Sequence, residues 1–282
     1  LVSCWKWRVL LGGEAPAIPF QRLVRFYLTG YYFTCLLPSN IGGDVVRSFY
    51  AGRDVGDQAR SGVSVFFERF TGLIFLLMLV IAAPMLDPSL YRSPAIFIPA
   101  VGALCLLILL VLLSRFRQPL KSFSRLLGED RASGGAGLVD RFRRATTGLS
   151  QKLKKGLHSL RRDPGVFWPV VLLTVGFYLL TWINVYLSFR AFGVTVGLAG
   201  IVAVLPAAMM VAMMPVAPLA GLGLSEFSYV FYFGLVGVDS EVSLAMGLLL
   251  RAKLLLLGLL GLLCHVTLCG RVERYDEFRA KS

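Results

Sequence analysis

Long uninterrupted apolar segments constrain the fold of this chain more than any other feature of its sequence. Four of them, at residues 61–83, 95–113, 166–189 and 242–269, are long enough to cross a bilayer. A transmembrane helix needs about 20 predominantly apolar residues. Hydrophobic residues make up 56% of the 282 residues, and charged residues only 16%. The sequence therefore predicts an all-α, polytopic transmembrane helix bundle that forms a single integral membrane domain over residues 1–282.

A fifth apolar segment, residues 26–37, is too short to span a membrane and ends at Pro38. Proline removes a backbone donor and clashes with the preceding helical turn, and Gly42 and Gly43 permit backbone angles that side chains disfavour. Irregular backbone at membrane depth persists only where protein or a wet cavity satisfies its polar groups. We therefore expect residues 38–47 to interrupt a membrane helix that re-enters on the side from which it came. A cytoplasmic turn that begins at Pro38 is the alternative.

A second interruption follows the apolar segment 196–214. It is formed by Pro215, Pro218, Gly221 and Gly223, and it ends at Glu226. Short, Gly/Pro-interrupted segments in both halves of a chain are typical of an inverted repeat with a site near the membrane midplane. The predicted halves are residues 1–114, interrupted at 38–47, and residues 166–282, interrupted at 215–226. A simple spanning segment in each half is the alternative to a re-entrant one.

The segment between the halves, residues 115–165, is strongly basic, with thirteen Lys and Arg residues against four Asp and Glu residues. By the positive-inside rule this loop is cytoplasmic, together with the basic C-terminus. Apolar residues at helical spacing within it predict an amphipathic helix on anionic lipid headgroups. Its membrane-surface residues would include Arg143, Arg144, Lys154 and Lys155. A helix packed on another protein is the alternative, and without aromatic interleaving we expect no nucleic-acid partner.

Ionisable residues also occur in or beside the membrane segments. They are Asp44, Arg47, Glu68, Arg69, Glu226, Arg251 and Lys253. A charge at the centre of a membrane helix costs on the order of 2.5–3.5 kcal/mol, so these side chains should face the bundle interior and pair. Glu68 and Arg69 point about 100° apart on a helix, so each needs another partner. Arg251 is suited to Glu68 or Glu226.

If all seven groups are charged, one positive charge is in surplus. An arginine in a wet groove is suited to a lipid phosphate, because its planar guanidinium binds two oxygens at once. A set of purely structural ion pairs is the alternative. Lys6 and Arg8, near the end of the first helical fragment, indicate a cytoplasmic exit, and we expect one or two further spans before Leu1.

The sequence provides no pattern for a cofactor or a catalytic centre. The five cysteines and two histidines have no metal-ligand spacing. Ser225 precedes Glu226 but has no histidine nearby in the sequence, so the pattern of a serine hydrolase is weak. We therefore expect no cofactor and no metal, and we favour a transporter over an enzyme.

Three motifs carry a resemblance to a known family. Residues 36–47, Leu-Leu-Pro-Ser-Asn-Ile-Gly-Gly-Asp-Val-Val-Arg, resemble the LPxxxGGDxxR signature of the lysylphosphatidylglycerol synthase transmembrane-domain family. Residues 67–72, Phe-Glu-Arg-Phe-Thr-Gly, are similar to its ER-x-x-G segment. Residues 218–226 are similar to its GGxGxxE segment, although Ala220 replaces the first glycine, and Arg251 falls where a later span carries an arginine. The resemblance covers almost the whole chain.

The resemblance implies a flippase-like integral membrane protein. In the multiple peptide resistance factor such a domain moves lysylated phosphatidylglycerol across the bilayer, and related members accompany glycosyltransferases and polyprenyl-linked lipid synthesis. The sequence after the last span is too short for the soluble aminoacyl-transferase domain of the lysyl-lipid enzymes. The leading hypothesis is therefore a multi-pass protein of the cell (inner) membrane that translocates an anionic phospholipid or lipid-linked sugar.

The residues expected to line its polar groove are Asp44, Arg47, Glu68, Arg69, Glu226 and Arg251. Two other functions stay open. The chain could be a non-catalytic membrane partner that anchors a glycosyltransferase or lipid-modifying enzyme through the basic loop. It could also be a membrane-embedded transferase that uses Asp44 or Glu226 as a base.

Overall fold

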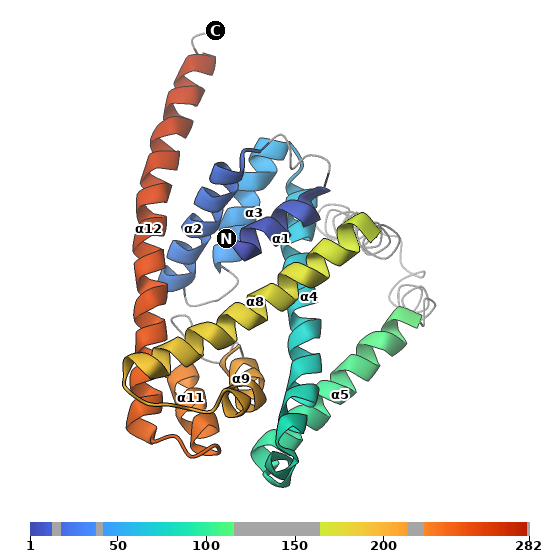
Figure 1. Cartoon of the computed structure of the whole chain (residues 1–282). Coiled ribbons are helices and arrows are strands. Elements are labelled where there is room, and N and C mark those ends of the chain that lie inside the picture. The colour runs from blue at the N-terminus through green and yellow to red at the C-terminus, as the bar shows by residue number, and fades with distance from the viewer. Residues whose placement is uncertain (13–17, 38–41, 116–163, 214–222, 281–282) are drawn as a thin grey trace, which may run out of the picture.

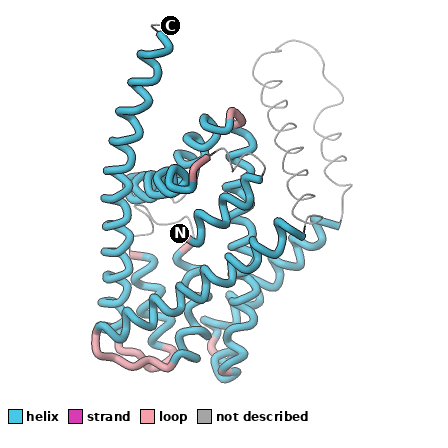
Figure 2. The backbone as a smooth tube through the Cα atoms, turned by 45° about the horizontal axis from the view of Figure 1, so that its top comes forward, coloured by secondary structure: helices cyan, strands magenta, loops and turns pink. Residues whose placement is uncertain are grey.

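The computed structural model describes residues 1–12, 18–37, 42–115, 164–213 and 223–280 (Figure 1). Over these residues the regular elements are helices, and Figure 2 shows helices and loops but no strand. The α-helices are α1 (Val2–Leu11), α2 (Phe20–Leu36), α3 (Gly42–Val55), α4 (Gln58–Ala82), α5 (Pro94–Arg115), α8 (Pro164–Ala191), α9 (Leu198–Ala212), α11 (Leu224–Gly234) and α12 (Ser240–Ala280). Two 3₁₀ turns, Ala83–Leu86 and Pro88–Arg92, connect α4 to α5. The prediction of an all-α fold is confirmed.

Four of the described helical segments are long and apolar enough to cross a membrane: Gln58–Leu86, Pro94–Leu112, Gly165–Ala191 and Ser240–Thr267. They coincide with the four spans expected from the sequence. Large apolar side chains stand exposed on their outer faces, for example Leu109, Leu172 and Leu259. Such faces are suited to lipid, in which helices keep their backbone groups satisfied internally. These helices form a multi-pass membrane bundle.

Helices α2 and α3, of 17 and 14 residues, are shorter than the spans and pack side by side. Their approach is very close, because a Cβ atom on Gly43 would lie 2.1 Å from the carbonyl oxygen of Gly30. Small residues at a helix contact allow this separation in membrane proteins. Gly42 and Gly43 belong to the first turn of α3, and neither is among the described glycines with positive φ. At Gly43 the glycine is thus required for space and not, as the sequence suggested, for an unusual backbone angle.

Helix α2 packs on its other side against the last helix, α12. A Cβ atom on Gly261 would lie 2.0 Å from the carbonyl oxygen of Leu28, and one on Gly258 would lie 3.1 Å from Cys35 Sγ. The hydroxyl of Tyr50, on α3, lies 3.2 Å from His265 Nδ1 of α12. The α2–α3 pair is therefore held against α12 by contacts between residues that lie more than 200 positions apart in the chain.

A second pair of short helices, α9 with 15 residues and α11 with 11, occurs in the other half of the chain. Each short pair is followed by a long helix, α4 in the first half and α12 in the second. The α2–α3 pair lies toward one end of the bundle, and α9 and α11 lie toward the opposite end (Figure 1). Entry of the two interrupted segments from opposite sides of the membrane stays a prediction.

The predicted break residues Pro38, Pro215, Pro218 and Gly221 lie outside the described residues. Gly223 is described, and its φ of +87° places it in the left-handed region immediately before α11.

The connections between helices group by end. The turns from α4 to α5, from α8 to α9 and from α11 to α12 lie at one end, whereas the α3–α4 turn and the end of α12 lie at the other (Figure 1). The grouping agrees with the predicted order of crossings. The basic segment, with Arg143, Arg144, Lys154 and Lys155, lies outside the described residues, so its cytoplasmic side and its amphipathic helix stay predictions.

Candidate functional site

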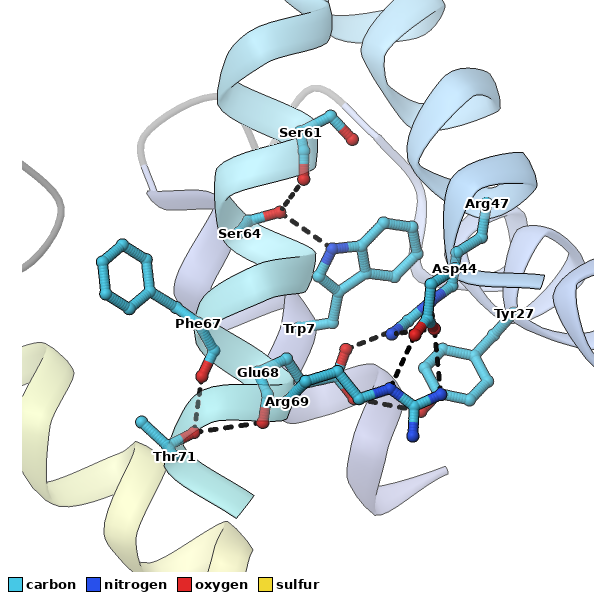
Figure 3. Close-up of polar contacts among 10 residues, drawn as sticks. All are labelled: Trp7, Tyr27, Asp44, Arg47, Ser61, Ser64, Phe67, Glu68, Arg69 and Thr71. Carbon is cyan, nitrogen blue, oxygen red and sulfur yellow. Dashed lines mark hydrogen bonds and ion pairs between the residues drawn. The ribbon is translucent and has the colours of Figure 1, made fainter. Parts of the chain in front are cut away.

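Charged side chains from α3 and α4 meet beside the α2–α3 pair (Figure 3). The side chain of Arg47 is almost fully buried, with 2% exposed. Its Nη1 lies 2.6 Å from Glu68 Oε2, and its Nε lies 3.0 Å from Asp44 Oδ1. Asp44 precedes Arg47 by three residues on α3, so the two share a helix face as the sequence predicted. A buried arginine with two carboxylate partners joins α3 to α4.

Asp44 also binds a second arginine, Arg69. Arg69 Nε and Nη2 lie 2.8 and 2.9 Å from the two carboxylate oxygens of Asp44, which makes the pair bidentate. Just over half of the Arg69 side chain, 53%, is exposed. Glu68 and Arg69, although adjacent, thus have separate partners, as their angular separation on a helix required. One face of this network is buried and the other is open.

Aromatic rings complete the surroundings of Arg47 (Figure 3). Its guanidinium carbon lies 4.4 Å from the ring centre of Tyr27 and 5.1 Å from that of Trp7, within cation–π range. The Tyr27 hydroxyl donates to Glu68 Oε1 at 3.0 Å, and Trp7 Nε1 donates to Ser64 Oγ at 2.9 Å. Neither aromatic residue could be assigned to the site from the sequence, because the partner of an aromatic side chain in an apolar helix cannot be inferred from the residues around it.

The network borders a cavity of about 640 Å³ between α1, α2, α3, α4, α8, α9 and α12. Its charged lining consists of Lys6, Asp44, Arg47, Glu68 and Arg69. Its apolar lining includes Leu73, Leu173, Phe177, Met209, Met213 and Leu254. The volume is typical of a small-molecule or lipid-headgroup pocket. The cavity is therefore lined by both charged and apolar side chains.

Lys6 is a member of this lining that the sequence did not indicate. The sequence placed it at a cytoplasmic helix exit, but α1 packs against α4 and α8, and Lys6 is only 6% exposed. A Cβ atom on Gly72 of α4 would lie 3.9 Å from its ammonium nitrogen. The lysine is turned into the bundle because α1 lies across it rather than leaving it.

The remaining predicted site residues form a second network, on α11 and α12. Arg251 Nε lies 2.9 Å from Glu226 Oε1, and Arg251 Nη2 donates to Ser225 Oγ at 2.8 Å. Glu226 Oε2 also accepts from the backbone N–H of Gly223 at 2.9 Å, which caps the start of α11. Of the two partners expected for Arg251, the structure brings it to Glu226. Among the described residues that line the cavity, neither Glu226 nor Arg251 is present.

Lys253, the seventh ionisable residue, belongs to neither network. Its ammonium group donates to Asn184 Oδ1 and Ser188 Oγ of α8, each at 2.9 Å.

The two networks have the same design. In each, a carboxylate in the first turn of the second short helix binds an arginine of the following long helix, 25 residues later: Asp44 with Arg69, and Glu226 with Arg251. In both pairs the arginine uses Nε and Nη2. The two networks thus share their partners and spacing, and the internal repeat stays a prediction.

Comparison with known proteins agrees with these features. Residues 1–261 match the family described as the lysylphosphatidylglycerol synthase TM region. The chain belongs to this family. A UPF0104 membrane protein from Methanothermobacter thermautotrophicus is 26% identical over 255 residues, which cover 85% of this chain and 73% of the relative. No solved structure matches the chain. The resemblance inferred from residues 36–47, 67–72 and 218–226 is thereby confirmed for this family of membrane proteins.

Proposed function

We propose that this member of the lysylphosphatidylglycerol synthase TM family binds an anionic phospholipid or lipid-linked sugar and translocates it across the cell membrane. The observation that carries the proposal is the cavity of about 640 Å³, whose lining combines five charged side chains with several apolar ones. Such a lining matches an amphiphile with a charged headgroup and hydrocarbon chains.

The chemical task of a flippase is to move a polar headgroup past hydrocarbon. An ionised group without partners is very costly in an apolar medium, so the path must provide polar contacts. We assign the first contacts to the network of Asp44, Arg47, Glu68 and Arg69, in which the half-exposed Arg69 faces the ligand. Glu226 and Arg251 would provide a second polar station in the other half of the protein. Opening of the Asp44–Arg69 pair would release a guanidinium for a phosphate oxygen.

A lipid-scrambling assay tests the proposal. The 282-residue chain would be reconstituted into vesicles of phosphatidylcholine and phosphatidylglycerol with fluorescent phosphatidylglycerol in both leaflets, and an impermeant reductant would be added outside. We expect bleaching to exceed the outer-leaflet fraction measured in protein-free vesicles. Arg69→Gln should slow the excess bleaching. The matched control, Arg22→Gln, removes an ion-paired arginine (Arg22 Nη1 to Asp54 Oδ2, 3.2 Å) that does not line the cavity and should have no effect.

Vesicles with the wild-type protein that bleach no further than protein-free vesicles would refute transport. If that result were accompanied by co-purification of a glycosyltransferase or lipid-modifying enzyme, the anchoring hypothesis would replace it. Neutralising Arg143, Arg144, Lys154 and Lys155 together should then abolish the co-purification.

The proposed orientation places the basic segment and the C-terminus in the cytoplasm of a cell whose inner membrane holds the protein. In a variant with all five cysteines replaced, Ser240→Cys at the start of α12 should react with an impermeant thiol reagent added outside the cell. Ser150→Cys in the basic segment should react only after the membrane is opened. The opposite pattern of labelling would reverse the orientation.

A further inference from the structure

The ammonium group of Lys6 is a buried positive charge that projects into the cavity. Lys6 is only 6% exposed as a residue, and it lines the cavity beside α4. Among the residues that the structure describes, it has neither a hydrogen-bond partner nor an ion-pair partner. The ammonium group lies beside Gly72, since a Cβ atom there would lie 3.9 Å from the nitrogen.

The other charges of the cavity are already balanced against one another. Arg47 binds Glu68 and Asp44, and Arg69 binds both oxygens of Asp44. Three cations against two carboxylates leave one positive charge in the lining, and Lys6 is the cation without a carboxylate partner among the described residues. A ligand with one negative charge would make the occupied cavity neutral.

Position as well as charge favours Lys6 as a ligand-binding group. Gly72 follows Arg69 by three residues on α4, so the ammonium group lies near the face of the helix that carries Arg69. The side chain of Arg69 is half-exposed, and its Nε and Nη2 bind Asp44. Two cationic groups therefore border the same cavity, which Leu173 and Phe177 of α8 also line.

We propose that Lys6 binds the phosphodiester group of a lipid that carries a single net negative charge. The assignment rests on the proposed function and specifies its substrate class. A compact ammonium group with three donors is suited to the oxygens of a phosphodiester. The single surplus charge selects a monoanionic lipid, such as phosphatidylglycerol, over zwitterionic phosphatidylcholine. The apolar side chains of the cavity lining favour a lipid over a free phosphate ion.

Thermal unfolding of the purified protein in detergent tests the site directly. Added phosphatidylglycerol should raise the midpoint of the wild-type protein, whereas phosphatidylcholine and inorganic phosphate should not. Lys6→Met should weaken the effect of phosphatidylglycerol about tenfold in concentration, as expected for a lost charge-assisted contact. Lys6→Arg should retain most of the effect. Arg8→Gln is the matched control, since it removes a positive charge from the same helix at a residue that is not part of the described cavity lining.

Stability without lipid separates this role from a structural one. Removing a buried charge that has no protein partner relieves a desolvation cost, so lipid-free Lys6→Met should unfold at the same temperature as the wild type or higher. A lower midpoint would mean that Lys6 has a structural partner and would overturn the assignment, as would equal stabilisation of Lys6→Met and wild type by phosphatidylglycerol. Stabilisation by inorganic phosphate would overturn the choice of a lipid.

The outcomes also separate the two proposals. If the wild-type protein and Lys6→Met scramble phosphatidylglycerol equally fast, the role of Lys6 is refuted and the proposed function stands. If the wild-type protein binds phosphatidylglycerol through Lys6 but scrambles no lipid, the proposed function is refuted and the binding site stands.

Discussion

Replacement of Gly43 by alanine should destabilise the protein, because the new Cβ atom would clash with the backbone of α2. The new Cβ atom would lie 2.1 Å from the carbonyl oxygen of Gly30 and 2.1 Å from Thr34 Oγ1. The threonine hydroxyl can rotate, but the carbonyl oxygen belongs to the backbone of α2. Because non-bonded heavy atoms approach optimally at roughly 3.5–4.0 Å, α3 would have to move away from α2 by more than about 1 Å.

The magnitude follows from two opposing effects. Overpacking of this kind costs about 1–3 kcal/mol, with the upper end appropriate where backbone is the obstacle. Alanine in place of glycine within a helix returns about 1 kcal/mol. We therefore expect a net loss of about 2 kcal/mol in the free energy of unfolding. A displaced α3 also carries Asp44 and Arg47 away from α4, so lipid movement should decrease together with stability.

The measurement is denaturant unfolding in mild detergent, with Gly62→Ala as the matched control. Gly62 lies in α4, and its added Cβ atom would meet Ser48 Oγ at an ordinary 3.6 Å, so this substitution should be neutral or slightly stabilising. Gly30→Ala should fall between the two, because its Cβ atom would lie 3.0 Å from the carbonyl oxygen of Gly43. If Gly43→Ala were as stable as Gly62→Ala, the close packing of α2 on α3 would be refuted.

Two further predictions concern the ion pairs. Arg47→Met should destabilise the protein by about 3–5 kcal/mol, because Glu68 is left buried and uncompensated. Adding Glu68→Gln should recover most of that loss in the same unfolding assay. An Arg47→Met protein of normal stability would show that the pair is not structural. Glu226→Gln and Arg251→Gln should show a coupling energy of roughly 0.5–3 kcal/mol in a double-mutant cycle, and additive effects would contradict their contact.

The sequence indicated the interrupted helices and their charges because both are local signals. Proline and paired glycines mark the ends of helices, and a three-residue spacing places Asp44 and Arg47 on one face. The adjacency of Glu68 and Arg69 also excluded their mutual pairing, which the structure confirms. Such inferences need only the geometry of a single helix.

Contacts between helices could not be inferred in the same way. The position of a lysine near a helix end indicates a side of the membrane, but the inward direction of Lys6 depends on how α1 packs against α4 and α8. Similarly, Arg251 had two candidate carboxylates in the sequence, Glu68 and Glu226, and the pairing of Glu68 with Arg47 instead depends on the packing of α3 against α4. Hydropathy measures how apolar a segment is, and it contains no information about the rotation of one helix against another.

The packing of α2 against α12 has a consequence for biosynthesis. Leu28 contacts Gly261 and Cys35 contacts Gly258, so the ribosome must complete more than 200 further residues before these contacts can form. Until then the short α2 and α3 helices lack a principal neighbour, and their charged residues lie in an unfinished bundle. Long-range contacts of this kind are slow to form and leave intermediates exposed. Nascent chains that stop before α12 should therefore be substrates for membrane chaperones and proteases, although most of their spans have already been inserted.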